Sequence, residues 1–226
     1  MRAPVSIVIP TLNASAALPG CLAALMEGVT AGLIRELIVS DAGSSDETAA
    51  IAQAAGARVV TGEASRGGQL RRGVAATDGA WVLIVHADSV LAPGWTVAVE
   101  QALDESRARY FDLAFDARGT GPALIARWAN LRARVFGLPY GDQGLLISRA
   151  LYDTRGGYAD QPLMEDVAMA RALRGQLQPL GHRVTTSYAR YAQAGAVKRG
   201  ARNLLTLGRY LAGADPEVLA RRYRKP

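Results

Sequence analysis

Short apolar runs alternate with longer amphipathic segments through the first half of the chain. Four of the runs have the length and the Val, Ile and Leu content of buried strands: 5–9, 36–40, 58–61 and 81–85. The spacing predicts three helices between them: 16–27, 44–56 and 69–76. Ser44 and Glu47 have the spacing of a capping box, which places the start of the second helix at Ser44. Near-continuous apolar strands separated by helices indicate a parallel sheet covered on both faces.

The alternation is looser in the second half. The pattern there predicts, in order, a strand at 110–115, a helix at 122–136, a loop at 137–144, a strand at 145–148, a helix at 166–174 and a strand at 183–186. We therefore predict one α/β domain over 1–194, followed by a helical tail over 195–226.

The charge of the chain is concentrated in the predicted tail. The whole chain carries a net charge of +6, and residues 195–226 alone hold eight basic and two acidic side chains. The main domain is balanced, so it lacks the basic face expected of a nucleic-acid binder. A single cysteine excludes an internal disulfide, and with only two histidines a Cys/His zinc site is excluded as well. Such a chain is expected in the reducing cytoplasm.

Polar clusters follow three of the predicted strands. They read Pro10-Thr11-Leu12-Asn13, Asp41-Ala42-Gly43-Ser44 and His86-Ala87-Asp88. Ligands of open parallel sheets bind beyond the carboxyl ends of the strands, so these clusters mark a candidate binding edge. Asn and Asp also cap helices and shape turns, which leaves a structural role open at each single cluster.

Several common site motifs are missing from the sequence. It has no Walker A loop, no Gly-x-Gly-x-x-Gly after a strand and no Gly-x-Ser-x-Gly. The groups available at the strand ends are carboxylates, backbone amides and arginines. That set suits a metal-bridged diphosphate and a carboxylate base.

These clusters, together with Glu165-Asp166, resemble the family 2 glycosyltransferases with a GT-A fold. The segments 139–144 and 162–166 are similar to a small, single-domain, bacterial-type branch of that family. The resemblance implies a mixed, mostly parallel sheet flanked by helices, as in nucleotide-diphospho-sugar transferases. It also implies inverting transfer of a sugar, a hexose by expectation, from a UDP- or GDP-linked donor with the help of Mn²⁺ or Mg²⁺.

The resemblance implies that the residues at the strand ends bind the nucleotide-sugar donor. Asp41 is expected to accept hydrogen bonds from the nucleotide base, with Thr11 and Asn13 lining the base and ribose pocket. Asp88 is the expected metal ligand, because a hard cation that bridges phosphates prefers carboxylate oxygen. The other residues expected to bind the nucleotide sugar are Pro10, Arg66, Gly67, Arg72, His86 and Ala87. Surface roles are the alternative for the two arginines.

Asp166 is the predicted general base, which takes the proton of the acceptor hydroxyl as its oxygen attacks the anomeric carbon. Glu165 is expected to orient this base or to touch the acceptor, and Asp142 and Gln143 are assigned to the acceptor side. Acidic residues also favour helix N-termini, so a structural role for Glu165 and Asp166 is the alternative.

Three departures from the family pattern bear on function. The usual Asp-x-Asp motif is His86-Ala87-Asp88, which leaves one carboxylate for a metal. Three roles are open for His86: it ligates the ion, contacts the ribose, which we favour, or packs at the strand end. Ala14 and Ala42 stand where acidic residues are common, which leaves the nucleotide base open. The Gln-x-x-Arg-Trp signature of polymerising members is absent, which indicates transfer of a single sugar.

The tail has the pattern of an amphipathic helix. Its small and apolar residues recur at helical spacing, while its arginines fall on another side: Val197, Ala201, Leu204, Gly208 and Leu211 against Arg199, Arg202 and Arg209. The pattern fits a helix docked on the domain, and it also fits a basic helix on an anionic membrane surface. The second arrangement suits a lipid-linked rather than a small soluble acceptor, and it places the protein at the inner face of the membrane.

Two other classes share parts of this pattern. Sugar-nucleotide pyrophosphorylases carry a Gly-rich basic loop after the first strand, and Pro10–Ser15 has neither a glycine nor a basic residue. A catalytically degenerate nucleotide-binding or membrane-surface module fits the incomplete metal motif. The intact Glu165-Asp166 pair opposes that alternative.

Overall fold

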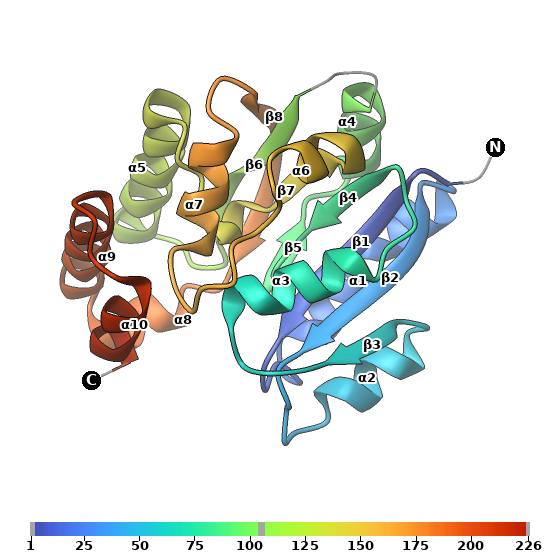
Figure 1. The fold of residues 1–226 in the computed structure, drawn as a ribbon, viewed down its shortest axis with the longest axis horizontal. Helices are drawn as coiled ribbons and strands as arrows, with labels where there is room; N and C mark the ends of the chain where they lie inside the picture. The colour runs from blue at the N-terminus through green and yellow to red at the C-terminus, as the bar shows by residue number, and fades with distance from the viewer. Residues whose placement is uncertain (1–2, 104–106, 225–226) are drawn as a thin grey trace.

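The structure is a computed structural model that describes residues 3–103 and 107–224. These residues form an eight-stranded mixed sheet flanked by helices (Figure 1). In spatial order the strands are β3 (Arg58–Thr61), β2 (Ile34–Asp41), β1 (Val5–Thr11), β4 (Trp81–Ile84), β7 (Leu145–Ser148), β6 (Ala108–Phe115), β8 (Leu177–Thr186) and β5 (Ser89–Leu91). Strands β3, β2, β1 and β4 are parallel, as are β6 and β8, whereas β7 and β5 run antiparallel to their neighbours. The predicted mixed, mostly parallel α/β class is confirmed.

Helices cover both faces of this sheet. Their bounds are α1 (Leu18–Thr30), α2 (Thr48–Ala54), α3 (Arg66–Ala75), α4 (Trp95–Ala102), α5 (Thr120–Phe136), the 3₁₀ turn η1 (Gly141–Gln143), α6 (Arg149–Thr154), α7 (Glu165–Ala172), α8 (Ala189–Ala194), α9 (Ala196–Leu211) and α10 (Pro216–Arg224). Alternate side chains of β1 enter different cores: Ile7 and Ile9 pack with α1 and α4, and Val8 packs with α3 and α7. Figure 1 shows α3, α6 and α7 over the face turned to the viewer.

Most of the predicted strands are confirmed in place. β3 and β7 have the predicted bounds, and β1, β2, β4 and β6 end within two residues of theirs. β8 is longer than expected, since it begins at Leu177 and not near Arg183. The pattern does not predict β5, α4, α6 or α8.

The second predicted helix starts later than expected. α2 begins at Thr48, and the Ser44 hydroxyl donates to Asp41 (2.5 Å) instead of capping a helix. The carboxylate of Asp46 accepts the Thr48 N–H (3.0 Å) and so holds the first turn. The predicted capping box is therefore wrong.

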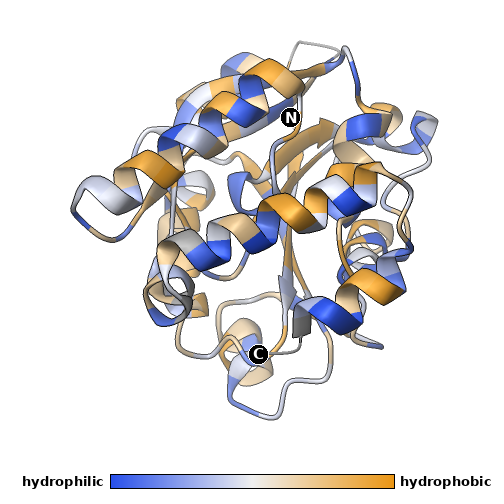
Figure 2. Ribbon diagram, turned by 90° about the vertical axis from the view of Figure 1, so that its left-hand side faces the viewer, coloured by the Kyte–Doolittle hydropathy of each residue, from blue (hydrophilic) through white to orange (hydrophobic). Residues whose placement is uncertain are grey.

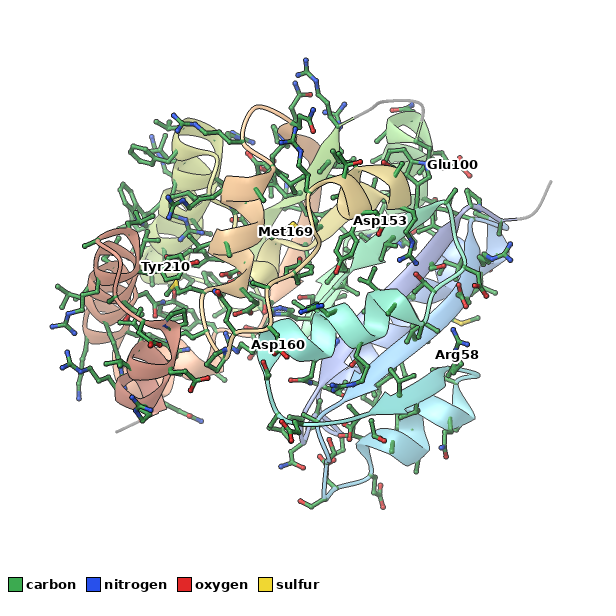
Figure 3. The ribbon with its side chains drawn as sticks, in the orientation of Figure 1. Arg58, Glu100, Asp153, Asp160, Met169 and Tyr210 are labelled. Atoms are coloured by element: carbon green, nitrogen blue, oxygen red, sulfur yellow. The ribbon has the colours of Figure 1, made fainter. Side chains whose placement is uncertain are left out.

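α3 starts at Arg66, earlier than the predicted start at 69, and it includes Gly67. The Gly67 N–H donates to the carbonyl of Gln161 (3.0 Å), and a Cβ on Gly67 would stand 1.9 Å from the carbonyl oxygen of Ala159. Only glycine permits this close approach of two backbones. In Figure 3, Asp160 of the same loop lies at the start of α3, where it accepts a hydrogen bond from Ser65 (2.6 Å).

The three C-terminal helices α8, α9 and α10 follow β8. Leu207 of α9 and Leu219 of α10 are buried against Leu163 and Met164, which precede α7. None of the described helices is long and apolar enough to cross a membrane. Lys225, one of the basic residues of the predicted tail, lies outside the described residues.

Candidate active site

The carboxylate of Asp41 organises the ends of β1 and β2. Its Oδ1 accepts hydrogen bonds from the hydroxyls of Thr11 (2.8 Å) and Ser44 (2.5 Å), and its Oδ2 accepts the backbone N–H groups of Gly43 (2.9 Å) and Ser44 (2.7 Å). Burial opposes ionisation of Asp41, but these hydrogen bonds outweigh it, so its pKa is lowered. Asp41 therefore anchors both loops as an ion, and its contact with a nucleotide base stays a prediction.

Asn13 extends this network with a left-handed backbone (φ +50°). Its Oδ1 accepts the N–H of Ser45 (2.8 Å), and its own N–H donates to the hydroxyl of Ser44 (2.8 Å). Gln69 of α3 is buried behind the strands and donates to the carbonyl of Thr11 (2.8 Å). The strand-end cluster predicted on the donor side is thus tied together by its own hydrogen bonds.

A pocket of about 140 Å³ lies near the carboxyl ends of β4, β6 and β8. Carboxylates from three separate parts of the chain line it: Asp88 follows β4, Asp142 lies in η1, and Asp166 lies in the first turn of α7. Arg66 and His86 line it as well. The structure therefore brings together the predicted metal ligand, the predicted base and one residue of the predicted acceptor side.

The carboxylate of Asp166 is held in a defined orientation. Its Oδ2 accepts the N–H of Gly141 (2.9 Å), and its Oδ1 accepts the N–H of Val167 (2.7 Å). Gly141 also lies against His86, because a Cβ at this glycine would stand 2.6 Å from the imidazole Nε2. Each carboxylate oxygen keeps a lone pair for a ligand, so the arrangement suits a general base.

Asp142 presents an unused acceptor in the same pocket. Its Oδ1 is buried and has no hydrogen-bond partner among the described residues. Burial raises the pKa of Asp142 to about 6, and the negative charges of Asp166 and Asp88 add to this effect against the opposing Arg132. A buried, unsatisfied acceptor is costly, which marks this oxygen as a contact point for a hydroxyl or a cation.

Glu165 does not face this pocket. Its side chain is 2% exposed and lines a second cavity of about 20 Å³, together with apolar residues such as Leu70 and Met169. Burial, reinforced by the charge of Asp166, raises the pKa of Glu165 to about 8 against the opposing charge of Arg66. At neutral pH Glu165 is therefore mainly protonated. Its burial argues against the predicted contact with an acceptor and leaves the predicted role of orienting Asp166.

Gln143 is not an acceptor contact in this structure. Its side chain is fully buried, where its amide donates to the carbonyl of Phe111 (3.1 Å) and its oxygen accepts the N–H of Tyr140 (3.3 Å). Arg132 of α5 supports the same loop, since its guanidinium lies 3.4 Å from the centre of the Tyr140 ring and donates to the carbonyl of Leu138 (2.9 Å). Gln143 and Arg132 fix the loop that carries Asp142.

The other predicted donor-side residues are spread more widely. Arg66 is exposed and lines the pocket, whereas Arg72 lies against Gly62 at the end of β3. The Nε and Nη2 of Arg72 are buried there and have no hydrogen-bond partner among residues 3–103 and 107–224. The structure therefore does not bring Arg72 to the pocket. Pro10 lies within β1, and Ala87 is buried between His86 and Asp88, which line the pocket. The side chains of Pro10 and Ala87 are not part of the pocket lining.

Sequence reasoning missed the residues that the C-terminal helices add to the pocket. These are Tyr191 of α8, Arg199 and Asn203 of α9, and Tyr223 of α10. The ring of Tyr191 stacks on Tyr188 and meets Phe115 edge-on. The only signal in the sequence was the placement of Arg199 away from the apolar stripe of its helix, which is equally typical of a solvated arginine.

The residues present suit a divalent metal that a ligand helps to hold. Among the described residues, no group of three or more His, Cys, Asp or Glu side chains is arranged to bind a metal. Mg²⁺ sites commonly use one or two carboxylates and complete their shell with phosphates and water. Asp88 and the unsatisfied Oδ1 of Asp142 provide such carboxylate oxygens in one pocket.

The mixed sheet and the carboxylates at its strand ends define an α/β protein with a candidate binding site, and comparison with known sequences is more specific. Residues 6–148 match the family described as Glycosyl transferase family 2. This match covers more than half of the chain, which therefore belongs to glycosyl transferase family 2. The predicted family is confirmed.

Individual relatives match shorter stretches. Glucosyl-3-phosphoglycerate synthase of Mycolicibacterium smegmatis is 39% identical over an alignment of 95 residues, and the match covers 38% of this chain and 31% of that protein. A PGL/p-HBAD biosynthesis glycosyltransferase of Mycobacterium tuberculosis is 37% identical over an alignment of 106 residues, and the match covers 43% of this chain and 41% of the relative. The chain thus matches about a third of the length of the first of these relatives.

Solved structures agree with the fold. Glucosyl-3-phosphoglycerate synthase from M. tuberculosis, in complex with Mn²⁺, UDP and glucosyl-3-phosphoglycerate, superposes with a TM-score of 0.57 at 25% identity and covers 81% of this chain and 70% of its own. S. aureus TarS (1–349) in complex with UDP superposes with a TM-score of 0.63 at 16% identity, covering 81% and 60%. The second likeness supports the fold alone.

Proposed function

We propose that this chain transfers one sugar unit from a UDP- or GDP-linked donor to an acceptor hydroxyl, with inversion at the anomeric carbon. Asp166 takes the proton of the hydroxyl, whose oxygen electron pair forms the new bond to the anomeric carbon. The bond from that carbon to the diphosphate breaks, and its electron pair leaves with the nucleoside diphosphate. The observation that carries this proposal is the carboxylate of Asp166, held by the Gly141 N–H in a pocket shared with Asp88 and Asp142.

Asp88 and Asp142 would hold a Mn²⁺ or Mg²⁺ ion together with the diphosphate oxygens. Such an ion, when bound, neutralises the charge that develops on the departing diphosphate. Solved structures of glucosyl-3-phosphoglycerate synthase contain UDP with Mn²⁺ or with Mg²⁺, which supports the choice of these ions and favours UDP. Arg66 at the mouth of the pocket adds a positive charge on the donor side.

Nucleotide binding tests the donor site without knowledge of the acceptor. We expect one of UDP and GDP to raise the Tm of the full chain in the presence of Mn²⁺, and Asp88→Asn to remove the metal-dependent part of that shift. Asp153→Asn is the matched control, because Asp153 is an exposed carboxylate on α6 that does not line the pocket (Figure 3). A metal-dependent Tm shift in Asp88→Asn as large as that of the unmodified chain would contradict the metal assignment.

A catalytically degenerate nucleotide-binding module is the second candidate, favoured by the single carboxylate of His86-Ala87-Asp88. The two candidates differ in turnover. A transferase releases the free nucleotide slowly from its donor even without an acceptor, because water can replace the hydroxyl. A degenerate module binds the same nucleotide and releases none.

We propose further that the chain associates with the cytoplasmic face of a membrane, where a lipid-linked acceptor would be available. Two helices carry exposed apolar stripes: Leu124, Trp128, Leu131 and Val135 on α5, and Leu204, Leu205 and Leu211 on α9. Figure 2 turns toward the viewer the side on which Figure 1 places both helices. Exposed Arg127 and Arg209 give this side positive charge, which suits anionic lipid. The side chain of Val197, which belongs to the predicted stripe, lies outside the described part of the chain.

Flotation with vesicles of phosphatidylcholine, with and without phosphatidylglycerol, tests the membrane proposal. We expect the chain to float with the anionic vesicles at low salt, and Leu131→Ser combined with Leu205→Ser to stay in solution. Val97→Ser is the control, since the exposure of Val97 (55%) lies between those of Leu131 (50%) and Leu205 (61%), but Val97 lies on α4. Retention of the unmodified chain in solution at low salt would contradict the proposal.

A further inference from the structure

The C-terminal helices contribute one wall of the pocket that holds the three carboxylates. Tyr191, Arg199, Asn203 and Tyr223 come from three consecutive helices and line the same space as Asp142 and Asp166. These helices are anchored by the buried contacts of Leu207 and Leu219 with the segment before α7. The segment that carries the predicted base is therefore packed directly against the helices that provide this wall.

The polar groups of this wall form one hydrogen-bonded chain. The Arg199 Nη2 donates to the hydroxyl of Tyr223 (3.4 Å), which donates to the Asn203 Oδ1 (3.0 Å), and the Asn203 Nδ2 donates to the hydroxyl of Tyr191 (3.3 Å). Each hydrogen-bonded group restrains the next one. This series of hydrogen bonds therefore fixes the guanidinium of Arg199 at the pocket before any ligand binds.

The guanidinium of Arg199 has a donor and a positive charge available to bind a ligand. Its Nε is buried and has no hydrogen-bond partner within the described part of the chain, and its Cζ lies 5.4 Å from the centre of the Tyr191 ring. Among the described residues no carboxylate lies within ion-pair distance of it. A partly buried cation without a counter-ion is unfavourable, and a planar guanidinium suits two-point recognition of phosphate or carboxylate.

The pKa of Tyr191 responds both to this cation and to the acidic side of the pocket. Burial raises the pKa of Tyr191, the charge of Asp142 raises it further, and the charge of Arg199 lowers it. Tyr191 is thus within reach of both groups. One wall holds the unsatisfied acceptor Oδ1 of Asp142, and the C-terminal wall holds the unsatisfied donor Nε of Arg199.

We infer that the C-terminal helices form a subsite for an anionic group of the acceptor, a phosphate or a carboxylate, with Arg199 as its principal contact. The inference rests on the proposed function. An acceptor bound beside three carboxylates is repelled if it carries negative charge. Arg199 is positioned by the C-terminal helices to offset that repulsion. A neutral acceptor would leave the guanidinium without a counter-ion. The subsite therefore selects acceptors that combine an attacking hydroxyl with an anion.

Calorimetric titration of the full chain, saturated with UDP and Mg²⁺, tests this subsite. The probes are 3-phosphoglycerate and farnesyl phosphate, which carry the anion on a small soluble and on an isoprenoid molecule, with glycerol as the neutral counterpart. We expect binding of at least one phosphate probe and none of glycerol. Tighter binding of 3-phosphoglycerate identifies a soluble acceptor, and tighter binding of farnesyl phosphate a lipid-linked one.

Arg199→Gln should weaken binding of the phosphate probe about 10- to 100-fold, the range expected for a charged hydrogen-bond pair. Arg221→Gln is the matched control, since Arg221 is an exposed arginine on the neighbouring helix α10 that does not line the pocket, and it should bind as the unmodified chain does. Arg199→Lys keeps the charge without the planar fork, and we expect an intermediate loss. It serves as the test if Arg199→Gln does not fold.

The outcomes separate this inference from the proposed function. If UDP binds but phosphate binding is unchanged in Arg199→Gln, the subsite is wrong and the donor site stands. If Arg199→Gln weakens UDP as much as the phosphate probe, Arg199 belongs to the donor diphosphate and the inference is overturned. If neither UDP nor GDP binds the unmodified chain, the proposed function fails, and the subsite fails with it.

Discussion

Replacing Gly67 with alanine perturbs the contact that fixes the start of α3 beside the pocket. The new Cβ would stand 1.9 Å from the carbonyl oxygen of Ala159 and 2.8 Å from the backbone nitrogen of Gln161. Cβ atoms essentially never approach other heavy atoms within 3.0 Å, so the two backbones must separate by about 1.1 Å. No rotamer change relieves a clash between backbones. The hydrogen bond from Gly67 to Gln161 (3.0 Å) is lost as they separate.

The magnitude follows from these two effects. Overpacking costs about 1–3 kcal/mol, and the lost hydrogen bond costs about 1 kcal/mol, so we expect a loss of about 2–4 kcal/mol in the free energy of unfolding. For a chain of this size each kcal/mol lowers Tm by about 2–4 °C, so Tm should fall by roughly 5–15 °C.

Thermal unfolding followed by circular dichroism measures this loss. Gly208→Ala is the control, because Gly208 lies inside α9 with no atom within 4 Å of a new Cβ. Alanine favours a helix over glycine by up to about 1 kcal/mol, so the control should melt at the same or a higher temperature. A Gly67→Ala variant that melts with the unmodified chain would refute the close packing of α3 on the loop at 159–161.

Two further predictions concern the pocket. Gly141→Ala should lower donor turnover about 100-fold, because the new Cβ would stand 2.6 Å from the His86 Nε2 and displace the loop that positions Asp166; unchanged release of nucleotide from the donor would contradict this. Glu165→Gln should flatten the pH dependence of stability. The folded state holds the Glu165 proton up to a pKa of about 8, above the ordinary value of 4.5, so the unfolding free energy of the unmodified chain falls as pH rises between these values. In urea unfolding, Glu165→Gln should have a higher free energy of unfolding than the unmodified chain by on the order of 2 kcal/mol near pH 7.5, and the same free energy near pH 4. An equal gain at both pH values would rule out titration of Glu165 as the cause.

The strands were predictable because burial on both faces leaves a local signature. Runs such as 81–84 are continuously apolar, and their length separates them from helices. The order of the strands leaves no such signature, since the insertion of β7 between β4 and β6 depends on pairing over long stretches of chain. The start of α2 was predicted wrongly for a local reason. Serine is a typical helix-capping residue, but the hydroxyl of Ser44 donates its hydrogen bond to Asp41.

The acidic part of the site was predictable through resemblance, residue by residue. Asp88, Asp142 and Asp166 do line one pocket. Their surroundings were not predictable, because the burial that raises the pKa of Glu165 and the hydrogen bonds that turn Gln143 inward are properties of the packed loop. The C-terminal wall was missed for the same reason. The boundary placed between 194 and 195 stays a prediction.

The most direct test of the account is the turnover of Asp166→Asn, measured as release of nucleotide from the sugar donor that binds. Asn keeps the shape of the side chain and can still accept the N–H of Gly141, but it takes no proton. We predict a loss of about 10²- to 10⁴-fold in turnover, with the dissociation constant for the nucleotide changed less than about threefold, or about 0.6 kcal/mol. Turnover equal to that of the unmodified chain would show that Asp166 is not the base and would contradict the central claim.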